Sequence, residues 1–405
     1  MQGQHIALFP LPGVSHVFPF LGLCPELVRR GYRVSVATIE AVAKRVVAAG
    51  AEPVIVETDS YSIPTAMAAI QELPLIDPKR WEELAHIHSR WLLNSVAITV
   101  RHLDEFYKKN RPSLVIYELS AYAGRILAKR FHAPAIQYYP DFIQHREYVC
   151  WETSVGHNPQ SIVDFSRLLD SFLWAYGFEG PDNFWQTEDL NLYQFPREFQ
   201  FNPDSIDSRR FCFVGPFLDR PFTPVWNSHS GGKRVILVSA VGGPIGGLID
   251  ASYFNKVIAA LSGSEYHVIL SVGEHFPISE LRTLPMNFEI NRCASHLEIL
   301  PHTDLHLYSG GPNGTLESLY FGVPLIAIPT FDRSYIIANR LAELGIVRNL
   351  PLHTLTSQMI RGNVESVLQD HTFLGRVKEM QKVVRSSGGS AMAVDRIEEF
   401  LAARA

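Results

Sequence analysis

Short apolar runs alternate with longer amphipathic stretches along the first third of the chain. The runs are too short for helices and lack alternating polar side chains, which is typical of strands buried on both faces. The first amphipathic stretch ends in Arg29 and Arg30 followed by Gly31, a composition that closes helices. Strand, loop, helix and strand in succession predict parallel βαβ units and an α/β fold. The predicted strands cover 5–11, 33–38, 113–117 and 134–138, and the predicted helices cover 20–30 and 121–131.

The same alternation returns in the second half of the chain. Between the two alternating regions, residues 139–215 are rich in aromatic side chains and follow no regular period. Because 405 residues exceed what one hydrophobic core usually serves, we expect two domains, 1–216 and 234–385. A segment with the proline, serine and glycine content of a linker joins them at 217–233, and a closing helix occupies 386–405. In the second domain, the predicted strands cover 234–239, 267–272, 288–291 and 305–308, and the predicted helices cover 253–261 and 315–320.

A glycine-rich turn follows the predicted strand at 305–308. Gly310, Gly311 and Gly314 interrupt regular structure before a helical pattern resumes. Main-chain amides in such a turn, with the positive end of the next helix, favour a bound anion, and Glu317 supplies an acceptor for ribose hydroxyls. The turn therefore predicts a nucleotide site. It is also compatible with a tight connection in a parallel sheet, in which Glu317 is a solvated helix residue.

His16 and Glu118 each follow a predicted strand of the first domain. His16 lies in the expected loop 12–19, and Glu118 comes directly after the strand at 113–117. Open α/β sheets bind ligands at this carboxyl edge. A neutral histidine acting as a base gains from a carboxylate that fixes its tautomer and stabilises the imidazolium. The alternatives are a surface or capping histidine and a solvated glutamate at a strand end.

Composition and charge exclude several classes of protein. A hydrophobic fraction of 46% with 19% charged residues is ordinary for a globular protein. The net charge of −5 comes with no basic stripe, so no nucleic-acid partner is expected. The four cysteines show neither disulfide nor zinc spacing, so no metal is expected. No apolar run reaches the length of a membrane span and the start lacks a basic region, so the prediction is a soluble cytoplasmic protein.

Two motifs resemble one enzyme family. GGPNGTLE has the layout of the donor-site signature of family 1 glycosyltransferases, with Asn313, Thr315 and Glu317 among the matching positions. GVSHVFPFLGLCPELVRRGYRVSVAT is similar to the opening of the macrolide-type members, in which the histidine at the position of His16 is the general base. The resemblance implies the GT-B fold, two Rossmann-like domains facing across a cleft, with the closing helix crossing back to the first domain. It also implies that Glu118 takes the place of the family's aspartate.

The resemblance implies that two glycine-rich loops bind the donor. Each loop differs from the family at one position. The loop 240–247 offers the amides of Gly242 and Gly243 to phosphate, although the family usually has a serine at the position of Gly242. Ser309 stands where the family has a histidine against the donor pyrophosphate, and a serine brings neither a ring nor a titratable charge. Gly310 and the residues after it keep the layout of the turn.

Two further positions depart from the family. Cys293, Ser295 and His296 match its tryptophan, proline and glutamine, so the stacking indole is missing and His296 is left to hydrogen-bond a base edge. The family's Asp-Gln pair, which holds sugar hydroxyls, aligns to Arg333 and the serine after it, with Asp332 one place early. Arg333 then either brings charge to the sugar or lies on the surface while Asp332 takes the family role.

The resemblance implies an inverting glycosyltransferase. His16 with Glu118 would deprotonate a hydroxyl or amine of a small, apolar or aromatic natural-product acceptor. The sugar would come from a nucleotide diphosphate sugar, UDP- or dTDP-linked, which is a co-substrate, so no cofactor is expected. The alternative is an inactive, glycosyltransferase-like helper of a biosynthetic partner, which would explain the donor-site changes together. The sequence leaves the nucleotide, the sugar, the acceptor and the oligomeric state open, a homodimer included.

Overall fold

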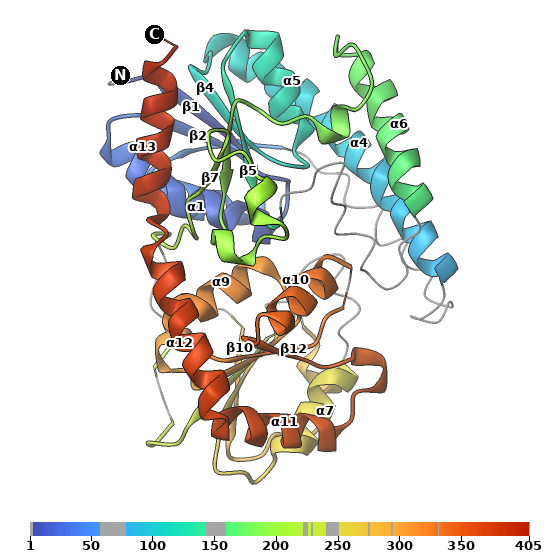
Figure 1. The fold of residues 1–405 in the computed structure, drawn as a ribbon, viewed down its shortest axis with the longest axis vertical. Coiled ribbons are helices and arrows are strands. Elements are labelled where there is room, and N and C mark those ends of the chain that lie inside the picture. The colour runs from blue at the N-terminus through green and yellow to red at the C-terminus, as the bar shows by residue number, and fades with distance from the viewer. Residues whose placement is uncertain are drawn as a thin grey trace. The chain divides into compact units, whose positions relative to one another are not determined.

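The computed structural model divides the chain into two compact units. Unit 1 comprises Met1–Pro221 and Ser387–Ala405, and unit 2 comprises Phe222–Ser386 (Figure 1). Gly242, Gly243 and Cys293 lie outside the described residues. The structure describes residues 3–56, 78–142, 159–221, 226–227, 230–239, 251–273, 276–292, 295–330 and 332–404.

Unit 1 is built on a parallel sheet with the strand order β3-β2-β1-β4-β5-β6-β7. Alternate residues of its strands enter two different cores. Ile6 and Leu8 pack with helices α1, α2 and α13, whereas Ala7 and Phe9 pack with α4, α5 and α6. Burial on both faces explains why the strands read as unbroken apolar runs. The strands are β1 His5–Phe9, β2 Arg33–Thr38, β3 Glu52–Ile55, β4 Leu114–Glu118, β5 Ala135–Tyr139, β6 Leu190–Tyr193 and β7 Phe211–Phe213. The helices are α1 Val14–Arg29, α2 Glu40–Ala48, α4 Pro78–Lys109, α5 Tyr122–Phe131, α6 Pro159–Trp174 and α13 Gly389–Ala402.

Helix α1 begins earlier than the sequence predicts, so His16 lies in its first turn and not in a loop. The expectation rested on Pro19, because a proline inside a helix removes one hydrogen bond and costs about 3 kcal/mol. The helix nevertheless continues through Pro19 and Pro25. Its inner face, including Val17 and Phe20, is fully buried in the core of unit 1, and this burial offsets the lost bond.

The region expected to be irregular, 139–215, contains regular elements. It holds α6 and the strands β6 and β7, which extend the sheet beyond β5. Its aromatic side chains obscured the periods of these elements, because they pack inside unit 1: Phe165 and Phe172 of α6 lie against the core beneath α4 and α5. The prediction of irregular structure was therefore wrong for α6 and β6, whereas β7 lies within 211–217, which resembles the strand that ends the first domain in the family.

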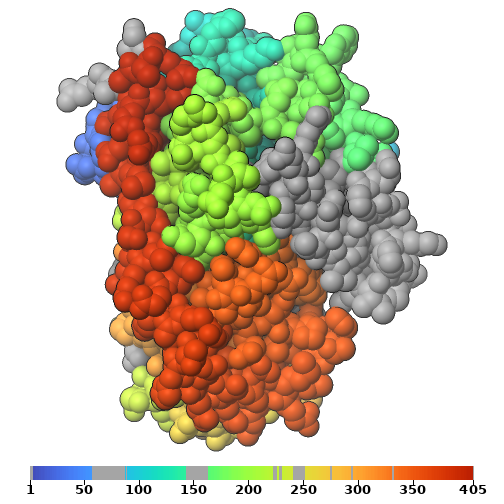
Figure 2. Space-filling view, viewed as in Figure 1, coloured from blue at the N-terminus to red at the C-terminus, as the bar shows by residue number. Residues whose placement is uncertain are grey.

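Helix α13 packs on α1 within unit 1, although most of the chain separates them. Ser390 Oγ donates to the carbonyl oxygen of Gly22 at 3.0 Å, and Arg30 pairs with Asp395 at 2.6 Å and Glu398 at 2.7 Å. The start of α13 is tied to the end of the β7 segment, since Gly389 N donates to Val214 O at 2.6 Å. Figure 2 shows α13 in red beside this yellow-green segment.

Unit 2 repeats the plan with the parallel order β10-β9-β8-β11-β12-β13. Helix α9 begins at Pro312, three places before the prediction, because proline at the first helical position loses no hydrogen bond and has a suitable φ. The strands are β8 Val235–Ser239, β9 His267–Ser271, β10 Phe288–Asn291, β11 Leu305–Tyr308, β12 Leu325–Ala327 and β13 Val347–Asn349. The helices are α7 Ala251–Leu261, α8 His296–Ile299, α9 Pro312–Phe321, α10 Asp332–Glu343, α11 Ser357–Gln369 and α12 His371–Ser386. Short 3-10 helices are η2 Asn183–Trp185, η3 Arg197–Phe199, η4 Pro203–Ser205, η6 Ile278–Glu280, η7 Leu300–His302 and η8 Leu352–Thr354.

Side chains of the expected linker are anchored in the unit to which each belongs. Phe217 is 2% exposed in unit 1 and stacks on Tyr138 with ring centroids 5.7 Å apart. In unit 2, Trp226 donates its main-chain N–H to Glu298 at 2.6 Å and its indole N–H to Glu289 at 2.5 Å. These two residues are therefore packed in their units, although the segment has the composition of a linker. Among the described helices, none has both the length and the apolar character that crossing a membrane requires.

Candidate functional site

Each unit has a point where the strand order reverses. In unit 1 the first strand, β1, lies between β2 and β4, and in unit 2 the first strand, β8, lies between β9 and β11. Segments that leave the carboxyl ends of two such strands diverge to opposite sides, and ligands of open α/β sheets bind in the crevice between them. His16 and Glu118 follow such strands in unit 1, and the glycine-rich turn follows β11 in unit 2. By contrast, His296 follows β10, and Asp332 and Arg333 follow β12.

His16 and Glu118 meet at the switch point of unit 1. His16 Nδ1 lies 2.6 Å from Glu118 Oε1, and the other carboxylate oxygen accepts the main-chain N–H of Leu11 at 2.9 Å. Glu118 is the last residue of β4 and its side chain is 2% exposed, while that of His16 is 28% exposed. The solvated-glutamate alternative is therefore wrong. Leu11 could not be predicted as a partner from the sequence, because a main-chain amide carries no residue identity.

The geometry of this pair determines which imidazole nitrogen carries the proton. A carboxylate accepts hydrogen bonds, so Nδ1–H donates to Glu118 and Nε2 keeps its lone pair. The partly exposed imidazole thus has a basic nitrogen, and the buried carboxylate stabilises the imidazolium that protonation forms. This arrangement suits a general base acting on a ligand at the carboxyl edge of the sheet.

The glycine-rich turn of unit 2 connects β11 to the start of α9. Gly310 has φ +80°, and a Cβ there would lie 2.9 Å from the carbonyl oxygen of Ser334, so the turn requires glycine. Gly311 is the N-cap residue of α9, and no side-chain hydrogen bond caps this end within the described residues. The first turn of α9 therefore presents main-chain amides and the positive end of the helix dipole.

The remaining residues of the turn occupy different environments. Ser309 is 4% exposed, and Asn313 and Gly314 lie half-buried in the first turn of α9 and not in a loop. The hydroxyl of Thr315 is used by the fold: it donates to Gly311 O at 3.0 Å and contacts the hydroxyl of Tyr308 at 2.8 Å. Thr315 therefore holds the turn in shape.

Glu317 is buried, so the interpretation as a solvated helix residue is wrong. It is 3% exposed, in the second turn of α9, and its Oε2 lies 4.0 Å from Nδ1 of His296, the first residue of α8. Ser295, which matches the family's proline, caps α8 by accepting the N–H of Leu297 at 3.3 Å. The structure thus brings two of the predicted donor residues, His296 and Glu317, together.

Polar residues at the carboxyl edge of the unit 2 sheet surround His296. Its Nε2 lies 3.1 Å from Ser271 Oγ, and its ring meets that of His306 edge-on at 5.6 Å. His306 is fully buried between Ser239 Oγ at 2.8 Å and Ser318 Oγ at 2.7 Å. Burial, and secondarily His296, hold the pKa of His306 well below its ordinary value. Sequence reasoning missed His306 because it sits within an apolar strand.

The positions aligned with the family's sugar-binding pair fall at the start of α10. The helix begins at Asp332, and Arg333 is half-buried in its first turn and not in a loop. Which of the two residues serves the sugar stays a prediction. Ser334 is fully buried and accepts the N–H of Thr330 at 3.0 Å. It therefore holds the turn that follows β12.

The comparisons with known proteins agree along the whole chain. The model of the family "Erythromycin biosynthesis protein CIII-like, C-terminal domain" matches residues 255–400. The chain is 31% identical to the NDP-glycosyltransferase YjiC of Bacillus subtilis strain 168, over 99% of this chain and 98% of the relative. It belongs to the macrolide-type family 1 glycosyltransferases. The oleandomycin glycosyltransferase of Streptomyces antibioticus is 27% identical over 99% of this chain and 91% of its own length. The crystal structure of the calicheamicin glycosyltransferase CalG4 matches with a TM-score of 0.81 and 28% identity over 99% of both chains.

The comparisons confirm the predicted fold class, with two parallel-sheet, Rossmann-like units as in GT-B glycosyltransferases. They also confirm that the chain is a glycosyltransferase, so the helper alternative is not favoured.

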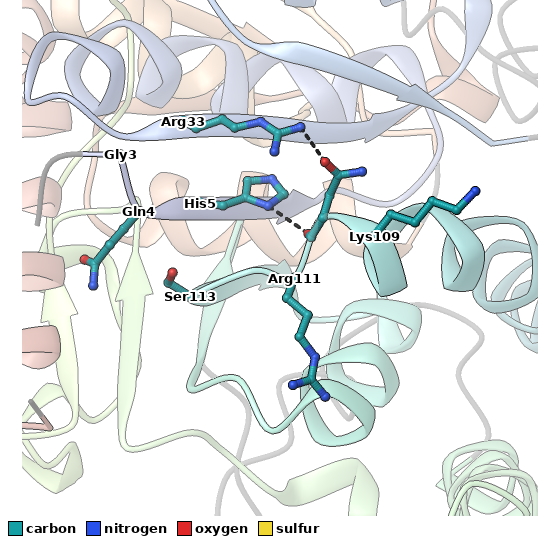
Figure 3. Close-up of a pocket in the computed structure, with 8 residues that line it drawn as sticks. Gly3, Gln4, His5, Arg33, Lys109, Arg111 and Ser113 are labelled. Atoms are coloured by element: carbon teal, nitrogen blue, oxygen red, sulfur yellow. Dashed lines mark hydrogen bonds between the residues drawn. The ribbon is translucent and has the colours of Figure 1, made fainter.

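A shallow polar pocket of about 490 Å³ in this glycosyltransferase lies away from both switch points. It is formed where β1, β2 and β4 begin, at the sheet edge opposite to His16 and Glu118 (Figure 3). Its cationic side chains do not converge: Arg33 is bonded to Asn110 and Glu52, while Lys109 and Arg111 point in different directions in Figure 3. The pocket is therefore not a candidate active site.

Proposed function

We propose that this glycosyltransferase inverts the anomeric centre and that His16 is its general base. The acceptor oxygen attacks the anomeric carbon of the donor sugar, and the bond from that carbon to the diphosphate oxygen breaks. His16 Nε2 takes the proton of the acceptor hydroxyl, and the diphosphate leaves with the electron pair. One displacement of this kind inverts the configuration of the anomeric carbon.

The contact between His16 Nδ1 and Glu118 is the observation that carries this proposal. At 2.6 Å from a carboxylate that is 2% exposed, the imidazole keeps the tautomer with a free Nε2. General-base catalysis of this type contributes about a hundred- to ten-thousandfold in rate. The Leu11 amide on the second oxygen supports the role, because it fixes the carboxylate in the orientation that His16 needs.

The proposed donor is a nucleotide diphosphate sugar, UDP- or dTDP-linked, which serves as co-substrate. The relative from Bacillus subtilis is named an NDP-glycosyltransferase. No described side chain caps the start of α9, so its main-chain amides are offered to the diphosphate. The same amides would stabilise the negative charge that grows as the diphosphate leaves. The buried carboxylate of Glu317 is the proposed acceptor for ribose hydroxyls, and Ser309, Gly310 and Asn313 line the same turn. Arg333 and Asp332, at the start of α10, remain the proposed sugar-side residues.

The proposed acceptor is a small, largely apolar natural product with a hydroxyl or amine. The named relatives support this class, since one is an oleandomycin glycosyltransferase and another the calicheamicin glycosyltransferase. Unit 1 carries an aromatic cluster on the segments that follow β5 and β6: Phe142 lies 5.7 Å from Phe195 and 4.9 Å from Phe201 between ring centroids. Phe142 and Phe195 are buried, so this cluster belongs to the core of these segments and no acceptor contact is assigned to it.

Product analysis tests the proposal. The protein is incubated with UDP- and dTDP-linked sugars of known anomeric configuration and a set of phenolic and macrolide acceptors. NMR of the product then gives the configuration of the new linkage. We expect inversion with at least one donor. Retained configuration would contradict the mechanism, while binding of nucleotide without transfer to any acceptor of this set would contradict the proposed acceptor class.

A further inference from the structure

The outer side of helix α6 exposes apolar side chains to solvent. Trp174 is 71% exposed, and Val163 and Leu168 of the same helix are exposed as well. The inner side of the helix, with Leu169 and Leu173, is buried in the core beneath α4 and α5. Figure 1 shows α6 in green on the outside of unit 1, beside α4. Exposed apolar side chains that gather on one element mark a surface that binds another molecule.

Four residues of α6 form a stripe whose spacing is the same in both directions along the helix. They follow one another at intervals of four, three and four residues, which places them on one side of a helix with 3.6 residues per turn. The stripe is apolar at both ends and charged in the middle, and it consists of Val163, Arg167, Asp170 and Trp174.

This stripe is complementary to itself when two copies of α6 lie antiparallel. A two-fold axis midway between Arg167 and Asp170 places Val163 of one copy level with Trp174 of the other. The same axis places the guanidinium group of Arg167 level with the carboxylate of Asp170 in the other copy. A shift of three residues along the helix would instead oppose Arg167 to Arg167, or Asp170 to Asp170. The charges therefore select a single register.

The carboxylate of Asp170 is already held in a fixed position within its own copy. It accepts the main-chain N–H of Asp182 at 3.0 Å and that of Asn183 at 2.9 Å, and also the side-chain amide of Asn183 at 2.9 Å. Two carboxylate oxygens accept about four hydrogen bonds, so this group can also accept one from a guanidinium. The Arg167 side chain is 76% exposed, and its 3.9 Å contact with Asp164 is longer than a hydrogen bond. Arg167 is thus available to a second molecule.

We propose that the outer side of α6 is an interface between two copies of this chain, which pair through their antiparallel α6 helices. Charge favours a second copy over an anionic membrane surface, because Glu179 and Asp182 follow the helix directly. Since α6 has 16 residues, its length is roughly 24 Å, and one helix pair forms a small interface. The dimer is therefore reversible, with a dissociation constant on the order of 1–100 μM.

Analytical ultracentrifugation of the full chain, from about 1 to 200 μM, tests the interface because this range brackets the expected constant. Trp174→Ala should weaken dimerisation about thirtyfold, since it removes the apolar pair at both ends. Arg167→Glu should weaken it about tenfold, since two attractive charge pairs become repulsive. Met286→Ala and Arg209→Glu alter exposed side chains outside α6 and should leave the constant unchanged. Thermal melting verifies that each variant is folded.

Cysteine cross-linking tests the antiparallel register. Val163→Cys and Trp174→Cys are prepared separately, and each is oxidised alone and as an equal mixture. The mixture should give a covalent dimer, because these two positions lie level across the two-fold axis. Neither variant alone should give more covalent dimer than wild type, which measures the background from the native cysteines.

Three outcomes would overturn the inference. The first is a wild type that remains monomeric up to about 200 μM. The second is a dimer whose dissociation constant is the same in Trp174→Ala and Arg167→Glu, because α6 would then lie outside the interface. The third is cross-linking of each cysteine variant with itself, which indicates parallel helices. If a monomeric wild type instead binds vesicles of phosphatidylcholine and phosphatidylglycerol, and Trp174→Ala does not, this surface contacts membranes and the proposed dimer is rejected.

Discussion

Each unit holds a histidine–glutamate pair near its switch point, and the two pairs differ in how closely they are joined. His16 and Glu118 lie 2.6 Å apart, and His296 and Glu317 lie 4.0 Å apart. In both pairs the carboxylate is buried and the imidazole is partly exposed. The closed pair is joined by a direct hydrogen bond that fixes the tautomer of its imidazole, whereas the atoms of the open pair are too far apart for a direct hydrogen bond. The difference teaches that residue types alone do not determine how closely a histidine and a glutamate are joined.

The largest expected effect comes from removing the imidazole of the closed pair. His16→Ala should lower turnover about a hundred- to ten-thousandfold, because the acceptor hydroxyl loses its base. Nucleotide affinity, measured by calorimetry, should stay the same, since His16 belongs to unit 1. His102→Ala, at an exposed position of α4, is the control. Near wild-type turnover of His16→Ala would remove the closed pair from the chemistry.

Removing the carboxylate of the open pair should act on binding. Glu317→Ala should weaken binding of the preferred nucleoside diphosphate by about 1.5 to 3 kcal/mol, because ribose hydroxyls lose a charged acceptor. Calorimetry measures the change, and Glu343→Ala, at the exposed end of α10, is the matched control. Unchanged affinity would mean that the buried carboxylate serves the fold alone.

The buried histidine beneath the open pair predicts a pH dependence of stability. The pKa of His306 is well below its ordinary value when folded, so below about pH 6.5 the unfolded chain binds a proton that the folded chain does not. Stability is therefore full above about pH 6.5 and falls as the pH decreases, by about 1.4 kcal/mol per pH unit for this residue. Urea denaturation of wild type and His306→Gln between pH 7.5 and 5.5 should show a shallower slope for the variant. His353→Gln, an exposed control, should keep the wild-type slope, and equal slopes in all three proteins would reject the effect.

The smallest expected effect probes the two contacts of Glu118. Glu118→Asp is shorter by one methylene group and cannot keep both the Leu11 amide and His16 Nδ1 at their present distances. Turnover should fall about threefold to tenfold, the range for one weakened hydrogen bond. The turnover of Glu118→Ala should fall further in the same assay. If the turnover of Glu118→Asp equals that of wild type, the hydrogen bond from the Leu11 amide is not what keeps His16 and Glu118 in contact.

The sequence predicted the bounds of several strands better than the starts of the helices. The strands β2, β10 and β11 have the predicted bounds, because runs buried on both faces are unambiguous. The starts of α1 and α9 were placed late, since prolines near a helix start resemble loop signals although the first position tolerates them.

The polar surroundings of the two pairs could not be predicted at all. The Leu11 amide, Ser271 and His306 reach the pairs through strand order, which a single sequence does not specify. The sequence motifs therefore indicate the residues of the two pairs, and only the fold shows which pair is joined by a direct hydrogen bond.

The return of the last helix to unit 1 has a consequence for building hybrid enzymes. In chain order, unit 2 is an insertion into unit 1, and Ala393, Val394 and Ile397 of α13 are fully buried against the core around α1. A chimera with a single junction in the linker would place a relative's α13 on this α1 and mismatch that core. Exchange of donor specificity between relatives therefore calls for two junctions, near residues 221 and 387, so that each α1 keeps its own closing helix.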